Sequence, residues 1–226
     1  MSVTVAIDGP AGSGKSSVAR AAAGRLGYGY LDTGAAYRAV AWHGLDTRTA
    51  MDDPEAVLAL LDTVDLDIST NPAERWVYVG DRDVADAIRT PEVSAAVGAV
   101  ARNLPLRARL NAWFRELIAA AEPGIVVEGR DITTVVAPDA AVRILLTADP
   151  EVRARRRAQE LGDAEHAAVG AAIAARDAHD ARVVDFMTAA PGVTTIDSTG
   201  LGFEETVDAV VELVRRTAGA EGERGH

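Results

Sequence analysis

The residues best suited to chemistry stand close together near the N-terminus, in the stretch Gly9–Ser17. Eight of them, Gly-Pro-Ala-Gly-Ser-Gly-Lys-Ser, fit the pattern G-x-x-x-x-G-K-[ST] at each fixed position. Glycines let the backbone curl so that successive N–H groups point at phosphate oxygens. Lys15 supplies a compact charge for the β- and γ-phosphates, and the Ser16 hydroxyl suits one Mg²⁺ position. The predicted ATP-binding residues are Gly9, Pro10, Ala11, Gly12, Ser13, Gly14, Lys15, Ser16 and Ser17.

The flanking sequence supports this phosphate loop. Val3–Ile7 is a short β-branched run, typical of a buried parallel strand, and Ser16–Leu26 is rich in alanine and arginine, as a helix would be. The order strand, glycine-rich loop, helix is what the motif requires. Lys15 is also the only lysine in the chain, so a compact ammonium is kept at the one place where it matters.

The remaining pattern predicts an α/β chain. Further strands are expected at Tyr28–Leu31, Gly124–Val127, Ala141–Leu146 and Val193–Ile196, and a small antiparallel hairpin at Leu66–Val84. Helices are expected at Tyr37–Leu45, Pro54–Val64, Pro91–Arg102, Pro105–Ala121, after Asp149-Pro150, at Ala164–Arg176 and at Phe203–Ala218. We therefore expect a parallel sheet flanked by helices in one domain, 1–218, with an acceptor-side insert at about 64–104, a lid at about 150–182 and a polar tail at 219–226.

Composition narrows the function. The formal net charge is −11, which disfavours binding to nucleic acid, although arginines gather near Arg102–Arg109 and Arg153–Arg157 and suit a small polyanion. The chain has no cysteine, which excludes thiolate chemistry. No apolar run is long enough to cross a bilayer, and the N-terminus does not read as a secretory signal. A cytoplasmic enzyme is expected.

The phosphate acceptor is the next question. A GTPase needs an Asn-Lys-x-Asp motif, which a chain with a single lysine at Lys15 cannot contain. Large ATPases usually carry a strand that ends in aspartate, whereas the nearest candidate here, Ile125–Glu128, ends in glutamate and runs into Gly-Arg-Asp. The short chain fits a small-molecule kinase better.

Further motifs make the chain resemble the bacterial cytidylate kinase family. They are Ile7–Pro10, Leu31–Arg38, Ile88–Val93, Glu128–Asp131, Thr134–Val136, Pro138–Ala140, Arg176-Asp177 with Asp180, and Ile196–Thr199. They are collinear and cover almost the whole chain. The resemblance implies transfer of the ATP γ-phosphoryl group to CMP or dCMP, with Mg²⁺.

The resemblance also implies a role for individual residues. Arginine forks bind the acceptor phosphate, and two of them with Lys15 neutralise the transferred group. The residues implied are Lys15, Arg130 and Arg176 for catalysis; Arg153 and Arg157 for closure over ATP; and Asp32, Thr33, Tyr37, Arg38, Arg107, Arg130, Asp131, Arg176 and Asp180 for the acceptor. Among these, Arg107 and Asp131 match positions that read the cytosine edge, and Asp180 matches a ribose contact.

Three positions depart from the family pattern. Gly98 stands near the position where the family often has a serine that helps to read the base, and Ser94 is one helical turn away. Val183 stands where the family usually has arginine, with Arg182 one position early, which on a helix rotates the side chain by ~100°. Thr133 stands where the family often has glycine.

Rival functions stay open at this point. A kinase for another nucleotide or for a metabolite alcohol would need a base, for which Asp32 is the candidate. A regulatory module that binds ATP without turnover would have no use for a lid, and a nucleic-acid-dependent ATPase conflicts with the acidic charge. The expected partners are ATP and CMP or dCMP, without nucleic acid or membrane, and the expected state is a monomer.

Overall fold

The computed structural model describes residues 2–160, 170–171, 177–178 and 185–224, and the chain forms two compact units. One unit consists of Met1–Tyr30 with Ala121–His226, and the other of Leu31–Ala120. The segment predicted as the acceptor-side insert, about 64–104, lies inside the second unit. The segment predicted as the lid falls in the first unit, where α6 (Pro150–Glu160) represents it.

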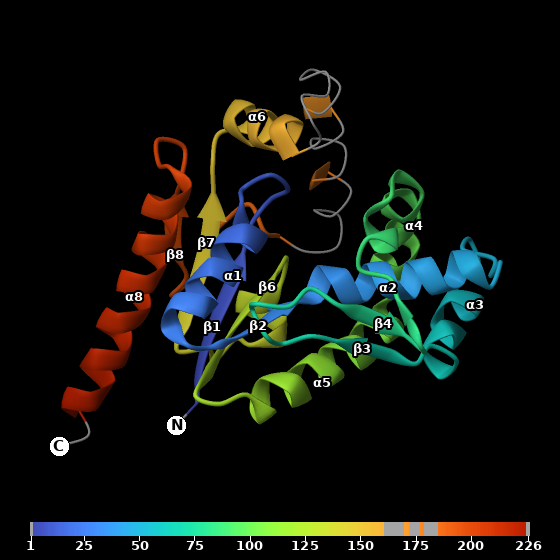
Figure 1. Cartoon of the computed structure of the whole chain (residues 1–226), viewed down its shortest axis with the longest axis horizontal. Coiled ribbons are helices and arrows are strands. Elements are labelled where there is room, and N and C mark those ends of the chain that lie inside the picture. The colour runs from blue at the N-terminus through green and yellow to red at the C-terminus, as the bar shows by residue number, and fades with distance from the viewer. Residues whose placement is uncertain (1, 161–169, 172–176, 179–184, 225–226) are drawn as a thin grey trace. The chain divides into compact units, whose positions relative to one another are not determined.

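A five-stranded sheet runs through the first unit (Figure 1) in the order β2-β6-β1-β7-β8. Its strands are β1 (Val3–Asp8), β2 (Gly29–Asp32), β6 (Gly124–Gly129), β7 (Val142–Thr147) and β8 (Thr194–Asp197). Strand β1 pairs in parallel with both β6 and β7, and β7 pairs in parallel with β8. The predicted parallel sheet flanked by helices is confirmed. Its carboxyl edge is where such folds bind ligands.

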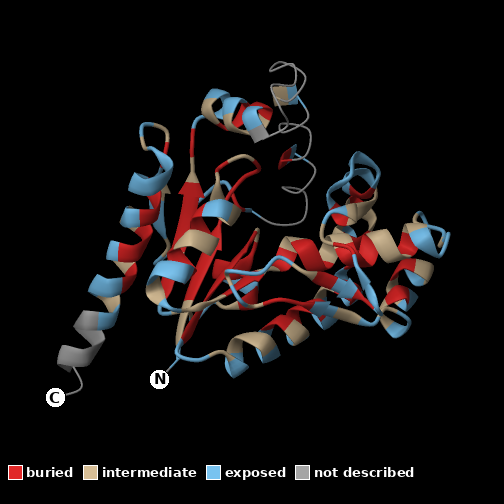
Figure 2. Cartoon of the chain, in the orientation of Figure 1, coloured by how far each residue is buried: buried red, intermediate tan, exposed pale blue. Residues whose placement is uncertain are grey.

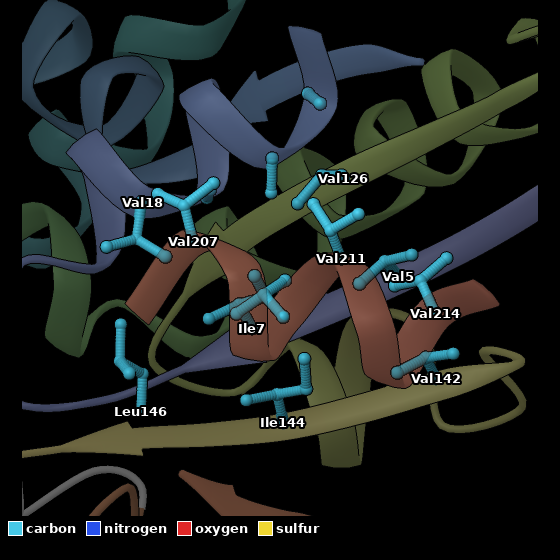
Figure 3. Packing of buried hydrophobic residues seen from close by; sticks show 14 of the residues in the cluster. Val5, Ile7, Val18, Val126, Val142, Ile144, Leu146, Val207, Val211 and Val214 are labelled. Atoms are coloured by element: carbon cyan, nitrogen blue, oxygen red, sulfur yellow. The ribbon is translucent and has the colours of Figure 1, made fainter. Parts of the chain in front are cut away.

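The core of the first unit lies between this sheet and two helices, α1 (Lys15–Leu26) and α8 (Phe203–Arg224). Figure 3 shows Val5 and Ile7 of β1 meeting valines of both helices. Val207, Val211 and Val214 recur at helical spacing, so one stripe of α8 is buried. Figure 2 shows the same division, with the central strands β1, β6 and β7 mostly buried and the outer helix faces exposed. The first strand is thereby fixed directly before the phosphate loop.

The second unit is built around α2 (Thr33–Asp46), which packs against α4 (Pro91–Arg102). Its other helices are α3 (Pro54–Ala59), η1 (Leu60–Asp62), η2 (Ala87–Arg89) and α5 (Leu104–Ala120). A separate antiparallel sheet contains β3 (Leu66–Ile68), β4 (Val77–Val79) and β5 (Arg82–Asp83). The small alanines on the buried face of α2 allow α4 to approach closely.

Several boundaries differ from those expected. The hairpin at Leu66–Val84 carries a third short strand, β5, so it was predicted one strand short. Helix α2 starts at Thr33 because the Asp32 side chain caps it, and α8 continues to Arg224, into the predicted polar tail. The helix expected at Ala164–Arg176 lies largely outside the described residues. Within the described ranges, no helix is both long and apolar enough to span a membrane.

Two glycines give opposite predictions for the same substitution. A Cβ on Gly124, at the start of β6, would lie 2.6 Å from the backbone oxygen of Val3 and 3.0 Å from the Tyr28 ring. Gly124→Ala should therefore lower the free energy of unfolding by about 1–3 kcal/mol through overpacking. Gly24→Ala, in α1 with open space around it, should raise the free energy of unfolding by up to ~1 kcal/mol. Urea unfolding measures the free energy of unfolding of both variants. Equal changes in the two variants would contradict the close packing around Gly124 in β6.

Candidate active site

The phosphate loop connects β1 to α1, and its glycines occupy positions that other residues would not tolerate. Gly12 and Gly14 have φ values of 75° and 83°, in the left-handed region. A Cβ on Gly9 would lie 2.2 Å from the backbone oxygen of Leu146, so β7 passes directly behind the loop. Helix α1 begins at Lys15, and the positive end of its dipole favours an anion there.

Three side chains surround Glu128 near the end of β6: Lys15 and Ser16 at the start of α1, and Tyr30 of the adjacent strand β2. The Glu128 carboxylate, 3% exposed, accepts a hydrogen bond from Ser16 Oγ at 2.6 Å and lies 3.8 Å from Lys15 Nζ. The Tyr30 hydroxyl donates to the same carboxylate at 3.3 Å, and the Arg20 guanidinium lies over the Tyr30 ring. Both side chains proposed to handle phosphate and metal are therefore oriented by one buried acid.

Glu128 is a residue of the candidate site that the sequence reasoning did not assign. In the sequence it stands out only as a glutamate at the place where a strand of a large ATPase usually ends in aspartate. The usable signal was its position, because an acid that ends a buried strand beside the phosphate-loop strand lies at the same edge of the sheet. The register confirms this, since Glu128 is opposite Ile7, two residues before Gly9.

Arg130, predicted to be catalytic, lies against the start of the phosphate loop. Its Nη1 donates to the Gly9 carbonyl at 2.6 Å, and its Nη2 lies 3.9 Å from Asp177 Oδ1. The guanidinium also lies over the Phe186 ring, 4.8 Å from its centre. Asp131, the next residue, is buried. The predicted pair after β6 is therefore placed at the edge of the sheet that carries the loop.

Arg153 takes a different place from that expected of an arginine that closes over ATP. It is 5% exposed and donates to the carbonyls of Ala148 and Ala11 and to Asp177 Oδ2. Asp177 in turn accepts from the Ala11 N–H at 2.9 Å. Arg153 and Asp177 thus hold the backbone of the phosphate loop at Ala11. Arg157, the other predicted lid arginine, is half-buried on the same helix, α6.

Arg156, between these two, also contacts the phosphate loop and was not predicted. It donates to the carbonyl of Ser13 at 3.3 Å, to the Ser198 hydroxyl at 2.9 Å and to the carbonyls of Ser198 and Leu201. The loop after β8 is thereby connected to the phosphate loop through one side chain of α6. Ser198 belongs to the Ile196–Thr199 motif, which the sequence reasoning noted without giving it a role.

The predicted acceptor residues of the second unit lie mainly along α2. Arg38 donates to the Ser94 hydroxyl at 3.1 Å, and the Arg107 guanidinium lies 5.6 Å from the centre of the Tyr37 ring. Tyr37 donates to Asn111 at 3.4 Å, a buried residue that the sequence reasoning missed. The second unit therefore brings Arg38, Tyr37 and Arg107 together with Ser94.

Two other predicted acceptor residues of this unit have structural contacts of their own. Asp32 accepts from the Ala35 N–H at 2.9 Å as the cap of α2, and its other oxygen lies 3.7 Å from Arg89. Thr33, the first residue of the helix, is buried. Arg176, Asp180, Arg182 and Val183 lie outside the described residues.

Comparison with known proteins decides the family. A family model described as cytidylate kinase matches residues 5–216. A cytidylate kinase from Cutibacterium acnes is 46% identical, and the match covers 94% of this chain and 96% of that protein. A cytidylate kinase from Streptomyces coelicolor is 45% identical, with 94% and 92% covered. This chain belongs to the cytidylate kinase family. The predicted family is confirmed, and with it the prediction that the chain is a kinase.

A solved structure, TT1252 from Thermus thermophilus, aligns over 97% of both chains at 19% identity with a TM-score of 0.47. At that score the alignment adds nothing to the family assignment, which stands on the sequence matches.

The buried pair beside the phosphate loop yields a stability prediction. Asp177→Asn removes the charge that neutralises Arg153, and leaving a buried guanidinium unpaired should cost about 3–5 kcal/mol of unfolding free energy. Asp208→Asn is the matched control, because Asp208 pairs with Arg25 on the surface, where such a pair contributes about 0–1 kcal/mol. Urea unfolding of both variants is the measurement, and equal losses would show that the Arg153 pair is not buried as described.

Proposed function

We propose that this chain transfers the γ-phosphoryl group of ATP to the 5′-phosphate of CMP or dCMP, giving ADP and CDP or dCDP. The observation that carries the proposal is the cluster at the carboxyl edge of the sheet, where Lys15 and Ser16 meet the buried Glu128. In a chain of the cytidylate kinase family, this arrangement suits a phosphate loop that binds the phosphates of the donor nucleotide.

The donor side is assigned to Gly9–Ser17. The backbone N–H groups of the loop and the N-terminus of α1 would receive the ATP phosphates, and Lys15 would contact the β- and γ-phosphates as a point charge. Glu128 orients both Lys15 and Ser16. Arg153 and Arg156 hold the backbone of the loop by donating hydrogen bonds to the carbonyls of Ala11 and Ser13.

Magnesium fits the residues present. Ser16 offers a hydroxyl oxygen whose partner is a carboxylate, and Mg²⁺ prefers hard oxygen ligands while keeping waters and substrate phosphates in its remaining positions. Ser16 would therefore be its direct protein ligand, and Asp32 would act through water. When bound, the ion would neutralise charge on the β- and γ-phosphates.

The acceptor side is assigned to arginines and to the residues that read the base. Arg38, Arg130 and Arg176 would bind the monophosphate dianion through charge-assisted hydrogen bonds, with Thr33 and Tyr37 beside it. Arg107 and Asp131 would read the cytosine edge, and Asp180 the ribose. An acidic acceptor beside the 4-amino group distinguishes cytosine from uracil. Ser94 carries the hydroxyl that Gly98 lacks, and it already contacts Arg38.

The proposed reaction needs no covalent intermediate with the protein. The acceptor phosphate is already an oxyanion, so no general base is needed, and positioning with charge neutralisation supplies the rate. Lys15, Arg130 and Arg176 are the cations proposed to face the charge that develops on the transferred group. ATP and CMP or dCMP are the proposed partners. A cytoplasmic location and a monomeric state remain predictions.

The substrate assignment predicts a clear order of acceptors. With ATP and Mg²⁺, ADP release should be fast with CMP and dCMP and at least about tenfold slower with UMP and AMP, because one unpaired polar group at the base costs 1–3 kcal/mol. A coupled ADP-release assay with the four acceptors in parallel measures this. Equal rates with UMP would contradict base reading by Arg107 and Asp131, and no release with any acceptor would overturn the proposed function.

The lysine of the phosphate loop gives a second test. Lys15→Ala should lower kcat by at least about 10³-fold, since it removes the charge on the transferred phosphoryl group, while the fold persists. Arg25→Ala is the matched control, because it removes another cation of α1 on the exposed side and should leave kcat unchanged. Wild-type turnover in a folded Lys15→Ala protein would exclude the assigned role.

A further inference from the structure

A second buried carboxylate, Asp8, ends strand β1 directly before Gly9. It is 3% exposed and accepts three hydrogen bonds. Oδ1 accepts from the Ile132 N–H at 2.8 Å, and Oδ2 accepts from the Thr133 N–H at 2.8 Å and from the Thr133 hydroxyl at 2.6 Å. All three donors belong to the turn η3 (Ile132–Val136), which follows Arg130 and Asp131. Asp8 therefore ties the strand that starts the phosphate loop to the segment that carries Arg130.

The surroundings of Asp8 make the hydroxyl of Thr133 important. Burial raises the pKa of the Asp8 carboxyl above its ordinary value, and the nearby negative charge of Asp131 raises it further. The hydrogen bond from the Thr133 hydroxyl is the largest influence in the opposite direction, ahead of the two backbone N–H groups. In the described part of the chain, Thr133 is the one side chain that donates to this carboxylate.

The other charged groups around the turn are engaged elsewhere. Arg130 donates to the carbonyl of Gly9, the residue after Asp8, and Arg143 of β7 donates to the carbonyl of Thr133 at 3.3 Å. Glu128, from β6, binds Ser16 and lies near Lys15. Asp8 therefore depends on hydrogen-bond donors for its charge, and a threonine contributes one that a glycine cannot.

We propose that Thr133 is a positioning residue for phosphoryl transfer: its hydroxyl, with the Ile132 and Thr133 N–H groups, binds the Asp8 carboxylate, and this contact holds the turn after β6 so that Arg130 stays against Gly9. This inference rests on the catalytic role proposed for Arg130. Thr133 would thus serve the site through Asp8, without touching either substrate.

The proposal has a definite pH dependence. Protonated Asp8 offers a weaker acceptor to the three donors, so activity should be complete above the pKa of Asp8 and fall as pH drops through it. Removing the Thr133 hydroxyl raises the pKa of Asp8 further. The acid limb of the activity profile should therefore move to higher pH in Thr133→Val.

Folding stability should follow the opposite trend. A carboxyl whose pKa is raised in the folded protein contributes stability that is greatest at low pH and is lost as pH rises through its folded pKa. The hydroxyl bond is stronger while Asp8 is ionised, so the stability cost of Thr133→Val should be largest at neutral pH and shrink in acid. If Thr133 had only a structural role, the loss of kcat in Thr133→Val would follow its loss of stability and would be greatest at neutral pH.

The experiment compares kcat for CMP phosphorylation by the full chain, from about pH 9 down to the most acidic pH at which the wild type still turns over, because the raised pKa of Asp8 moves its titration toward that range. Thr133→Val should stay within about twofold of wild type at the alkaline end and fall about tenfold behind it at the acid end, as expected for one lost bond to a charged group. ATP and CMP titrate identically with every variant. The kcat of the variant divided by that of the wild type at the same pH therefore reports only titration of groups in the protein.

Three variants complete the test. Thr133→Ser keeps the hydroxyl and should restore the wild-type profile, and Thr195→Val, which replaces an exposed threonine of β8, should not alter it. If Thr133→Val does not fold, Thr133→Ala serves in its place. A kcat ratio that stays constant with pH, or a serine variant that behaves like valine, would overturn the inference. Absent CMP turnover in the wild type would instead count against the proposed function.

Discussion

The buried carboxylate of Glu128 is the interaction on which the candidate site depends. An ionised acid that is nearly inaccessible to water must have a countercharge and hydrogen-bond donors, because its desolvation is otherwise too costly. Lys15, Ser16 and Tyr30 meet this need. The same contacts fix the two phosphate-loop side chains proposed to act on the nucleotide and its metal. The need to compensate one buried charge thereby positions Lys15 and Ser16 relative to each other.

The phosphate loop is also held from its other side. Arg153 and Asp177 bind the backbone at Ala11, Arg156 binds the backbone at Ser13, and Arg130 binds the carbonyl of Gly9. These side chains come from distant parts of the sequence and converge because the parallel strands end at one edge of the sheet. Several arginines that would suit a phosphate ligand thus also support the loop that is proposed to receive it.

Asp8 and Glu128 end adjacent strands, and each is satisfied differently. Glu128 has a cation beside it, whereas Asp8 has three uncharged donors in the turn η3. A carboxylate that relies on hydrogen bonds alone is more sensitive to the loss of one donor. Under the proposal, this difference is why the Thr133 hydroxyl matters to the site, although Thr133 is not among the residues proposed to contact substrate.

The sequence by itself determined the phosphate loop, the parallel α/β fold and the family, because local patterns carry them: β-branched runs, a glycine-rich turn before a helix, and a lone lysine. It also named Arg38, Tyr37 and Arg107, which the second unit brings together. Only the tertiary structure decided that Glu128 partners Lys15, that Arg153 is buried against Ala11, and that Thr133 bonds to Asp8. Those contacts join residues far apart in the chain, and no local pattern encodes which strand ends become neighbours or which side chain fills the space between them.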